Sequence, residues 1–510
     1  MAYEPPLFTT HFSKSGFVLE FDEYVKTEGM SNQLVISPPL KQLPDYSIRG
    51  KRLIVSWKDT LQTDATYQFN FGSALVDVNE GNPKSDLIYV FSTGDYIDSL
   101  LIAGSVVDVM DNMPLAGAAV MLYKGEADSL PTTTLPDYYT ITDEAGNFKL
   151  KYLPEGAFKI FVLHEEQKNY MYNGPPEKIG FLEERVSSSL NDSTDLIFLR
   201  AFIEKDTSQY VASRKETDYG YYEMVFNIPV TEPEILFMDV ETNDYLEAIN
   251  LITIGKDTLK SWVTIPDRDG FEEVAVYFRD DTTYIDTAYW YIEPNPKYKQ
   301  KAELKITSNT SRNKLDLEKA FSLDFNNPVV EMDTSLIYFL EDSVRVFSDE
   351  FKLINNNRKA MISYPFKSES RYFFKAAPGA FRDIFGLYSD SLSMAFSLQE
   401  DEYYGSLSLT IAPTENNDPS ETKILQLIDS KGTVLSEKTY KSRFSHTFSR
   451  LNPGKYGLKV IFDKNDNGKW DTGIYRKKIQ AEILSLYPEE IEIRSNWEFD
   501  VEWTPTAPAD

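Results

Sequence analysis

Two stretches of this chain, far apart in the sequence, repeat one pattern of residues at nearly the same spacing. Residues 19–25 (LEFDEYV) return as residues 323–329 (LDFNNPV). In the first copy Tyr67 lies 42 residues after the motif ends, and in the second copy Tyr372 lies 43 residues after it. A Phe-Ser pair begins 24 residues after each of these tyrosines. Chance does not readily produce such a match, so we infer a duplicated domain, named A and A′.

A second motif follows each copy of the first. Residues 148–158 (FKLKYLPEGAF) return as residues 446–456 (HTFSRLNPGKY). Each motif holds a turn glycine with an aromatic residue two positions later. A glycine lets the chain change direction, and the aromatic ring then packs back over the core. These motifs indicate a second duplicated domain, named B and B′.

The repeats set the order of domains as A-B-X-A′-B′. A strand-rich segment, X, lies between the two pairs and matches neither repeat. We infer that an A–B pair was duplicated and that X was inserted or diverged. The length of 510 residues fits four or five domains at roughly 100–150 residues each. The predicted domains are A at residues 1–97, B at 98–193, X at 194–298, A′ at 299–400 and B′ at 401–510.

Strand signals dominate throughout the chain. Apolar residues alternate with polar ones, so that Phe17, Leu19 and Phe21 fall on one face of an extended segment. This period of two is typical of half-buried strands, and helical periodicity is almost absent. Proline and glycine breaks recur at intervals suited to hairpins and Greek keys. The sequence therefore predicts an all-β, elongated multidomain chain of tandem β-sandwiches.

Composition excludes several classes of function. With 80 acidic and 52 basic residues, the formal net charge is −28, and such a polyanion repels nucleic acid. The absence of cysteine excludes disulfides, thiolate zinc sites and a thiol nucleophile. The three histidines, His11, His164 and His446, are far apart, which argues against a histidine metal site or a Ser-His-Asp triad.

No run of residues approaches the length of about 18 apolar residues that a membrane-spanning helix needs. The first residues, MAYEPP, read as the start of a mature domain and not as a signal peptide. We therefore expect any targeting segment of an exported form to lie outside this sequence.

Domain A resembles the bacterial, SbsA-type Ig-like domain of S-layer and surface proteins of Bacteroidota. The matching residues are 18–25 (VLEFDEYV), 36–40 (ISPPL), 70–72 (NFG), 77–83 (DVNEGNP) and 90–95 (VFSTGD). Domain B resembles the carboxypeptidase-regulatory, prealbumin-like module, in residues 102–108 (IAGSVVD), 114–120 (PLAGAAV) and 142–148 (TDEAGNF).

The whole chain resembles the Ig-like-domain lipoproteins of that phylum. This resemblance implies tandem Ig-like and prealbumin-like sandwiches on the extracellular face of the outer membrane. A lipidated cysteine would anchor such a protein, but this chain contains no cysteine, so the anchor is absent from it.

One motif carries recognisable chemistry. Residues 463–471 (DKNDNGKWD) fit the first half of a calcium loop, D-x-[DN]-x-[DN]-G. Gly468 permits the sharp turn, and position twelve is Ile474 where such loops place a bidentate Glu. With two carboxylates, a Ca²⁺ affinity on the order of 10⁻⁴–10⁻³ M is expected. The predicted oxygen ligands are those of Asp463, Asn465, Asn467, Asp471 and the carbonyl of Lys469.

The alternative for this motif is an Asx-rich turn, in which Asp and Asn side chains cap their own backbone. Domain B offers a comparison, because its equivalent segment is residues 165–173 (EEQKNYMYN), with Tyr170 in place of Gly468. If B folds the same way, an ion in B′ would stiffen the loop locally and would not be required for folding.

Other polar clusters are less specific. Asp77, Asn79, Glu80 and Asn82 fit a solvated hairpin loop better than a cation site. Adjacent carboxylates point to opposite faces of a strand and make no acid–base pair. The tyrosine clusters near Tyr139 and Tyr170 could stack on sugars, but sandwich core is the favoured interpretation.

Three hypotheses of function follow. The first is a non-enzymatic scaffold or subunit of a surface complex, a rod of five sandwiches whose partners are outer-membrane or cell-surface proteins. The alternative is a carbohydrate-binding accessory protein of glycan uptake, which predicts a row of exposed aromatic side chains. An enzyme would require carboxylates converging in a deep cleft, and no motif indicates one.

Overall fold

Strands make up nearly all of the regular structure, as the alternating pattern predicts. The computed structural model describes residues 1–84, 87–166, 169–188, 196–206, 209–230, 233–253, 255, 257–266, 273–280, 288–346, 351–413 and 421–506. None of the helices in these ranges is long and apolar enough to cross a membrane. They are α1 (Met30–Gln33), α2 (Leu130–Thr133), α3 (Pro296–Lys299), η1 (Thr334–Leu336), η2 (Asp401–Tyr403) and η3 (Tyr475–Lys477). The predicted all-β fold class of tandem Ig-like sandwiches is confirmed.

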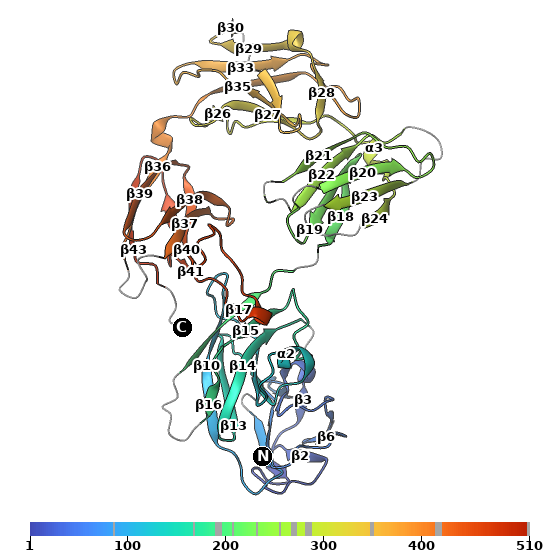
Figure 1. Cartoon of the computed structure of the whole chain (residues 1–510), viewed down its shortest axis with the longest axis vertical. Helices are drawn as coiled ribbons and strands as arrows, with labels where there is room; N and C mark the ends of the chain where they lie inside the picture. The colour runs from blue at the N-terminus through green and yellow to red at the C-terminus, as the bar shows by residue number, and fades with distance from the viewer. Residues whose placement is uncertain are drawn as a thin grey trace.

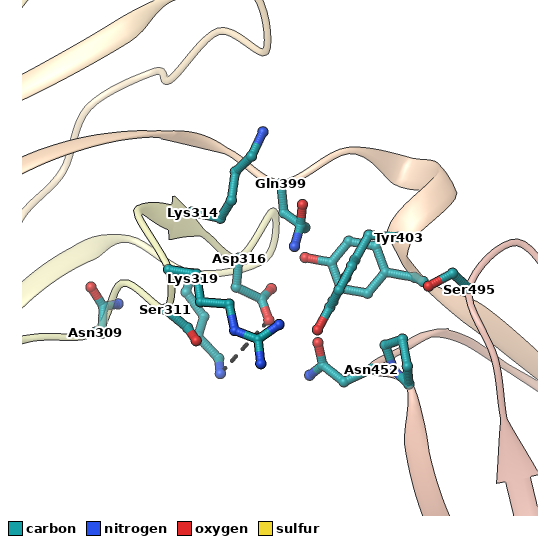
Figure 2. Close-up of a pocket in the computed structure, with 12 residues that line it drawn as sticks. Asn309, Ser311, Lys314, Asp316, Lys319, Gln399, Tyr403, Asn452 and Ser495 are labelled. Carbon is teal, nitrogen blue, oxygen red and sulfur yellow. Dashed lines mark ion pairs between the residues drawn. The ribbon is translucent and has the colours of Figure 1, made fainter.

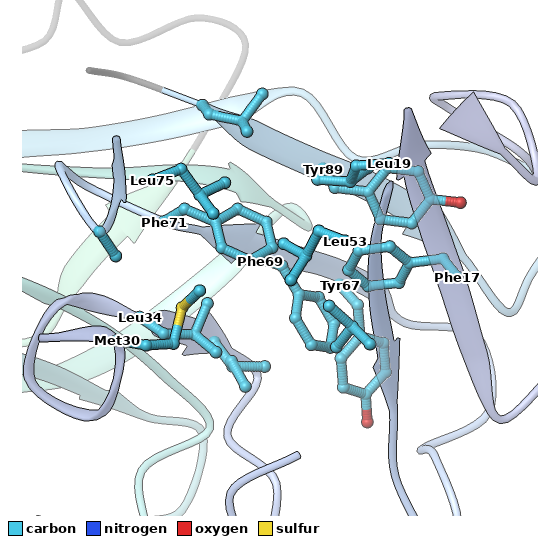
Figure 3. Packing of buried hydrophobic residues seen from close by; sticks show 14 of the residues in the cluster. Phe17, Leu19, Met30, Leu34, Leu53, Tyr67, Phe69, Phe71, Leu75 and Tyr89 are labelled. Atoms are coloured by element: carbon cyan, nitrogen blue, oxygen red, sulfur yellow. The ribbon is translucent and has the colours of Figure 1, made fainter. Parts of the chain in front are cut away.

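Domain A is a sandwich with an aromatic core (Figure 3). Alternation places Phe17, Leu19 and Leu53 on one inner face and Phe69 and Tyr89 on the other, all fully buried or nearly so. One sheet has the order β1 (Ala2–Glu4), β2 (Gly16–Glu20), β6 (Arg52–Ser56), β5 (Asp45–Arg49). The others are β4 (Val35–Ser37), β7 (Thr66–Asn70), β9 (Ile88–Ser92), and the pair β3 (Val25–Thr27), β8 (Leu75–Asp77).

Domain A′ repeats this plan. Its first sheet has the order β25 (Ile306–Ser308), β27 (Phe321–Phe325), β32 (Lys359–Ile362), β31 (Phe351–Ile354). The second has the order β26 (Lys314–Leu315), β35 (Leu392–Leu398), β33 (Arg371–Ala376), β29 (Ile337–Glu341), β30 (Val344–Val346). The strands β28 (Val329–Met332) and β34 (Phe381–Asp383) pair as β3 and β8 do.

The repeated tyrosines have the same role in both copies. The ring centroids of Tyr67 and Phe91 in A lie 5.5 Å apart, and those of Tyr372 and Phe396 in A′ also lie 5.5 Å apart. The backbone N–H five residues upstream donates to each tyrosine hydroxyl, at 2.9 Å in A and 2.7 Å in A′. A buried ring with a satisfied hydroxyl explains why this motif kept its spacing.

Domains B and B′ share their strand pairings, except that one further pairing in B joins its two sheets into one. In B the order is β12 (Tyr138–Ile141), β11 (Ala119–Tyr123), β14 (Gly156–His164), β15 (Lys178–Phe181), β17 (Ile197–Ile203), β10 (Leu100–Asp108), β13 (Asn147–Leu153), with β16 (Val186–Ser188) on β14. In B′ one sheet is β39 (Phe444–Leu451), β36 (Gly405–Ile411), β43 (Glu498–Trp503). The other is β38 (Val434–Tyr440), β37 (Thr422–Asp429), β40 (Gly454–Asp463), β41 (Leu484–Leu486), with β42 (Ile491–Ile493) on β40.

The last strand of B lies beyond the predicted domain boundary at residue 193. Strand β17 pairs in parallel with β10 and antiparallel with β15, so B includes residues up to Ile203. The equivalent strand β43 pairs in parallel with β36 in B′. The parallel partner of β17 is distant in sequence and leaves no local pattern, but the backbone pairing joins β17 to B.

Domain X is a two-sheet sandwich. One sheet has the order β18 (Val211–Asp218), β19 (Tyr221–Phe226), β22 (Thr258–Val263), β21 (Ala248–Ile252). The other has the order β20 (Pro233–Asp239), β23 (Val274–Asp280), β24 (Ala288–Ile292). Trp262 joins X to A′: it is fully buried, its Nε1 donates to the carbonyl of Asn326 (3.1 Å), and the Arg358 guanidinium lies 4.5 Å from its ring centroid.

The five domains do not form the expected rod. Domains B, X, A′ and B′ follow one another around a ring, and a segment of B′ returns to B (Figure 1). This segment contains η3 and contacts the outer face of the sheet of B near β15 and β17. Domain A packs beside B, where the Tyr139 hydroxyl accepts from Ile36 N (3.3 Å) and Tyr139 N donates to Ser37 Oγ (3.1 Å). The prediction of a rod was wrong because no local sequence signal reports contacts between domains so far apart.

Candidate functional site

The long connection between β40 and β41 of B′ is the feature that closes the ring. We call residues 464–483 the arm. Its first half covers its own domain: Trp470 packs on the cluster of Ile424, Ile461 and Leu484, and its Nε1 donates to the carbonyl of Glu482 (2.8 Å). Its second half lies on the outer apolar face of B. One segment therefore covers an apolar sheet face on each of the two related domains.

Tyr475 is the anchor of the arm. Only 6% of its surface is exposed, and its ring meets Phe161 at 5.8 Å and Phe181 at 5.6 Å between centroids, both edge to face. Its hydroxyl donates to the carbonyl of Asp128. Burial raises the pKa of Tyr475, so the phenol stays neutral and can donate. Burying such a ring contributes about 1.5–3 kcal/mol, and favourable ring geometry adds about 0.5–1.5 kcal/mol per pair.

Polar contacts fix the direction of the arm. Glu204 Oε1 accepts from Tyr475 N (2.7 Å), while its other oxygen accepts from the Tyr172 hydroxyl (2.6 Å). Gln480 Nε2 donates to the carbonyl of Phe181 (2.8 Å), and Thr472 Oγ1 donates to that of Ile203 (2.6 Å). Backbone groups on both partners are thereby satisfied, which buried interfaces require.

An ion pair and a close approach of the backbone also contribute to the contact between the arm and B. Lys478 lies 3.1 Å from Asp128, and Lys159 of B lies 2.6 Å from the same carboxylate. Hydrogen bonds from Lys159 and then Lys478 lower the pKa of Asp128. Gly473 is placed where an added Cβ would overlap the ring of Phe202, which is itself buried. Only glycine therefore allows the arm to lie this close to the sheet.

The predicted calcium motif forms the start of the arm. Asp463 is buried, and its two oxygens accept from the backbone N–H groups of Asn467 (3.1 Å) and Gly468 (2.8 Å). Asn465 Nδ2 donates to Asp471 Oδ2 (2.7 Å), as does the side-chain amide of Asn467. The structure thus brings these predicted ligands into one loop, where they bond to each other and to the backbone.

Glu482 is the member of this loop that sequence reasoning missed. Its Oε1 accepts from Lys464 N (2.9 Å) and its Oε2 from Asp471 N (3.0 Å), which ties the end of the arm to its beginning. Burial, and next the nearby Asp463, raise the pKa of Glu482. The residue lies far from the motif in sequence, and its only signal was a carboxylate between two apolar residues, Ala481 and Ile483.

Domain B closes the equivalent turn without the calcium-loop residues. Glu165 accepts from the backbone N–H groups of Tyr170 (2.8 Å) and Asn169 (3.1 Å), as Asp463 does in B′. Tyr170 has φ 58° and Gly468 has φ 79°, so both occupy the left-handed region. Residues 167 and 168 of this segment lie outside the described residues. The turn is therefore formed by carboxylate capping in both domains, and calcium binding in B′ stays a prediction.

Metal chemistry has no other candidate in the described residues. No group of three or more His, Asp or Glu side chains in those ranges is arranged to hold an ion. In the loop of A, Asp77 Oδ1 accepts from the N–H groups of Asn79 and Glu80, both at 2.6 Å, which is an Asx turn. The Tyr138–Tyr139 pair is buried in B, as the core interpretation predicts.

A polar cleft lies where A′ meets B′ (Figure 2). It has a volume of about 700 Å³, and Tyr403 is exposed beside it while Tyr404 is buried. The Tyr404 hydroxyl accepts from Leu317 N (3.1 Å) and so joins the two domains. The A′ side supplies charged side chains, among them the Lys319–Asp316 ion pair at 3.8 Å.

A known protein family matches domain A. Residues 2–93 match the family model described as bacterial Ig-like domain. The chain carries a bacterial Ig-like domain. The match covers the sandwich with the aromatic core. Sequence comparison with curated proteins gives no match.

Several solved structures of multidomain proteins overlap with the chain at low identity. The major pilin subunit BcpA of Bacillus cereus is 10% identical, with 80% of this chain and 99% of the pilin covered and a TM-score of 0.15. The Bacillus anthracis TIE protein is 9% identical, with 99% and 74% covered and a TM-score of 0.14. The S-layer protein rSbsC is 10% identical, with 95% and 67% covered and a TM-score of 0.14. At these TM-scores the overlaps carry no argument about the arrangement of the domains.

Proposed function

We propose that this chain is a non-enzymatic structural protein of the bacterial cell surface, whose arm holds domains B, X, A′ and B′ as a closed scaffold. The observation that supports this most is the burial of Tyr475 of B′ on the apolar face of B. A closed arrangement presents the loops and edges of several sandwiches at fixed positions, which suits the subunit of a larger complex. The bacterial Ig-like match of domain A supports the surface assignment.

The proposed location is the extracellular face of the outer membrane, with a lipid anchor that this cysteine-free chain does not contain. The partners would be outer-membrane or other cell-surface proteins. The resemblance to Ig-like-domain lipoproteins supports both points. Added protease should cleave the natural, anchored protein on intact cells, and protection until the cells are broken would contradict the location.

The scaffold role is tested by affinity capture of the anchored protein from its native membrane, followed by mass spectrometry. We expect a membrane protein at fixed stoichiometry with the wild type and less of it with Tyr475→Ser, because the variant loses the fixed geometry. Tyr338→Ser, at an exposed tyrosine of A′, is the control. A wild-type protein without a partner would contradict the scaffold role.

Glycan binding is the second candidate, and the A′–B′ cleft favours it. The cleft offers the Tyr403 ring beside amide and hydroxyl groups of residues such as Asn452 and Ser495. Aromatic faces with nearby donors and acceptors suit sugar rings. Neutral oligosaccharides should bind the wild type in calorimetry and bind Tyr403→Ala at least tenfold more weakly, with Tyr338→Ala as the control. Equal affinities for the wild type and Tyr403→Ala would exclude this cleft.

A further inference from the structure

Domain X contains a second pocket, of about 400 Å³, at one edge of its sandwich. Strand β18 is the edge of one sheet and β24 is the edge of the other, and residues from both line the pocket. The pocket therefore lies between the two sheets, at the side of the sandwich formed by these two edge strands. None of the residues that line it belongs to the arm or to the A′–B′ cleft.

Two polar atoms of the lining residues lack hydrogen-bond partners among the described residues. One is the hydroxyl of Tyr222, a side chain only 1% exposed, and the other is Oε1 of Glu216. The second oxygen of Glu216 accepts from Asn295 N (2.7 Å), and the backbone N–H of Gly220 also interacts with this carboxylate, so the group is held in place. Buried polar atoms without partners are costly, and native structures contain few of them.

The electrostatics of the pocket favour a cation. Four carboxylates line it, those of Glu216, Glu223, Glu273 and Glu293, against the two basic residues Arg214 and Lys215. Lys215 is paired with Glu223 at 3.8 Å. Burial raises the pKa of Glu216, and burial, followed by the charge of Glu216, raises the pKa of Tyr222. A buried carboxylate oxygen without a full hydrogen-bond partner is stabilised most by a positively charged donor.

We propose that this pocket binds a protonated primary amine. An ammonium group has three N–H donors, which can serve Glu216 Oε1, the Tyr222 oxygen and a neighbouring carboxylate at once. The aliphatic part of the ligand would lie along Ile292 and the exposed ring of Tyr291 at the mouth. This recognition fits the side chain of a lysine on a partner or the amine of an amino sugar.

The test uses the full chain and three probes in ligand-observed NMR: n-butylammonium, Nα-acetyl-lysine methylamide and glucosamine. Butan-1-ol, which has the same length without the charge, is the negative control. We expect butylammonium to bind with a Kd of about 1 mM, as suits a ligand of few atoms, and butan-1-ol not to bind. Tighter binding of the blocked lysine than of glucosamine identifies a lysine side chain as the source, and the reverse identifies an amino sugar.

Two variants locate the site. Glu216→Gln should weaken amine binding at least tenfold, whereas Glu234→Gln, at an exposed position of β20 outside the pocket, should not change it. Tyr222→Phe removes a hydroxyl without a partner, so it should fold and bind the amine several-fold more weakly. Absence of butylammonium binding to the wild type would overturn the proposal. Unchanged binding in Glu216→Gln would overturn it as well, because the amine would then bind elsewhere.

Discussion

The ring of Tyr475, in the fifth domain, meets the ring of Phe181, in the second domain, at 5.6 Å and 64°. The two residues are nearly 300 positions apart, and four domains of the chain form the path between them. This contact turns a linear series of sandwiches into a closed arrangement.

Removal of the Tyr475 side chain should open the closed arrangement of the domains, while each domain stays folded. Tyr475→Ser deletes a buried aromatic side chain, a change that costs about 3–5 kcal/mol in a packed core. That cost falls on the contact between B and B′, because the cores of both domains are formed by other residues. Small-angle scattering should show a larger radius of gyration, and hydrogen exchange should become faster in residues 472–481. Tyr338→Ser should change neither quantity.

A larger side chain at Gly473 should have the same effect by a different route. The Cβ of Gly473→Val would overlap the buried ring of Phe202, so the arm must move away from the sheet. Scattering should again report expansion, although Tyr475 is still present. If the domains stayed closed in the Gly473→Val variant, Phe202 would be able to move aside. The contact between the arm and B would then not depend on glycine at this position.

The stability of domain A′ should decrease as the pH falls, because of Glu341. Hydrogen bonds from Tyr364, Lys367 and Ser370 hold its pKa at about 2, against an ordinary value of 4.5. A carboxylate with a lowered pKa in the folded state stabilises the fold above pH 4.5, and that contribution is lost as pH falls toward 2.

Urea unfolding between pH 7 and pH 2.5 tests this dependence. The unfolding midpoint of A′ should fall with acid in the wild type, and Glu341→Gln should lower it at pH 7 and reduce its pH dependence. Glu369→Gln, at an exposed position of the same domain, should behave as the wild type. An unchanged pH profile in Glu341→Gln would show that other groups cause the dependence.

Calcium should bind weakly at the start of the arm, and its removal should not unfold B′. The turn is already capped by Asp463, so chelator should leave the folded state intact, while millimolar Ca²⁺ should raise the thermal midpoint slightly. Asp471→Asn should abolish that increase. Asp463→Ala should destabilise B′ by about 1–3 kcal/mol without calcium, because two backbone N–H groups lose their acceptor. No response to 10 mM Ca²⁺, on the order of ten times the weakest expected Kd, would exclude the ion.

The sequence contained enough information to predict the sandwiches and their duplication. Motifs such as residues 19–25 combine strand alternation with a fixed distance to Tyr67, and both features come from contacts inside one domain. The strand β17 was assigned to the wrong domain because a parallel partner distant in sequence leaves no local pattern.

The contact between B and B′ could not be predicted. Tyr475 and Gly473 lie in a segment without alternation, and their partners, Phe181 and Phe202, look like ordinary strand residues. Glu482 was missed because it is distant from the calcium-like motif in sequence. It contacts the motif only because the arm folds back on itself. The five predicted ligands could be proposed from sequence because they occupy one short segment of chain, and calcium binding by them stays a prediction.

Carbodiimide crosslinking tests the closed arrangement most directly, because it joins a lysine to a carboxylate only when the two are in contact. Lys478 of B′ lies 3.1 Å from Asp128 of B, so the wild type should give a peptide that links residues 478 and 128. In a mixture of ¹⁴N- and ¹⁵N-labelled protein this link should join fragments of one isotope only, and Tyr475→Ser should lose it. A wild type without the link, or with links mainly between differently labelled chains, would contradict a chain that closes on itself.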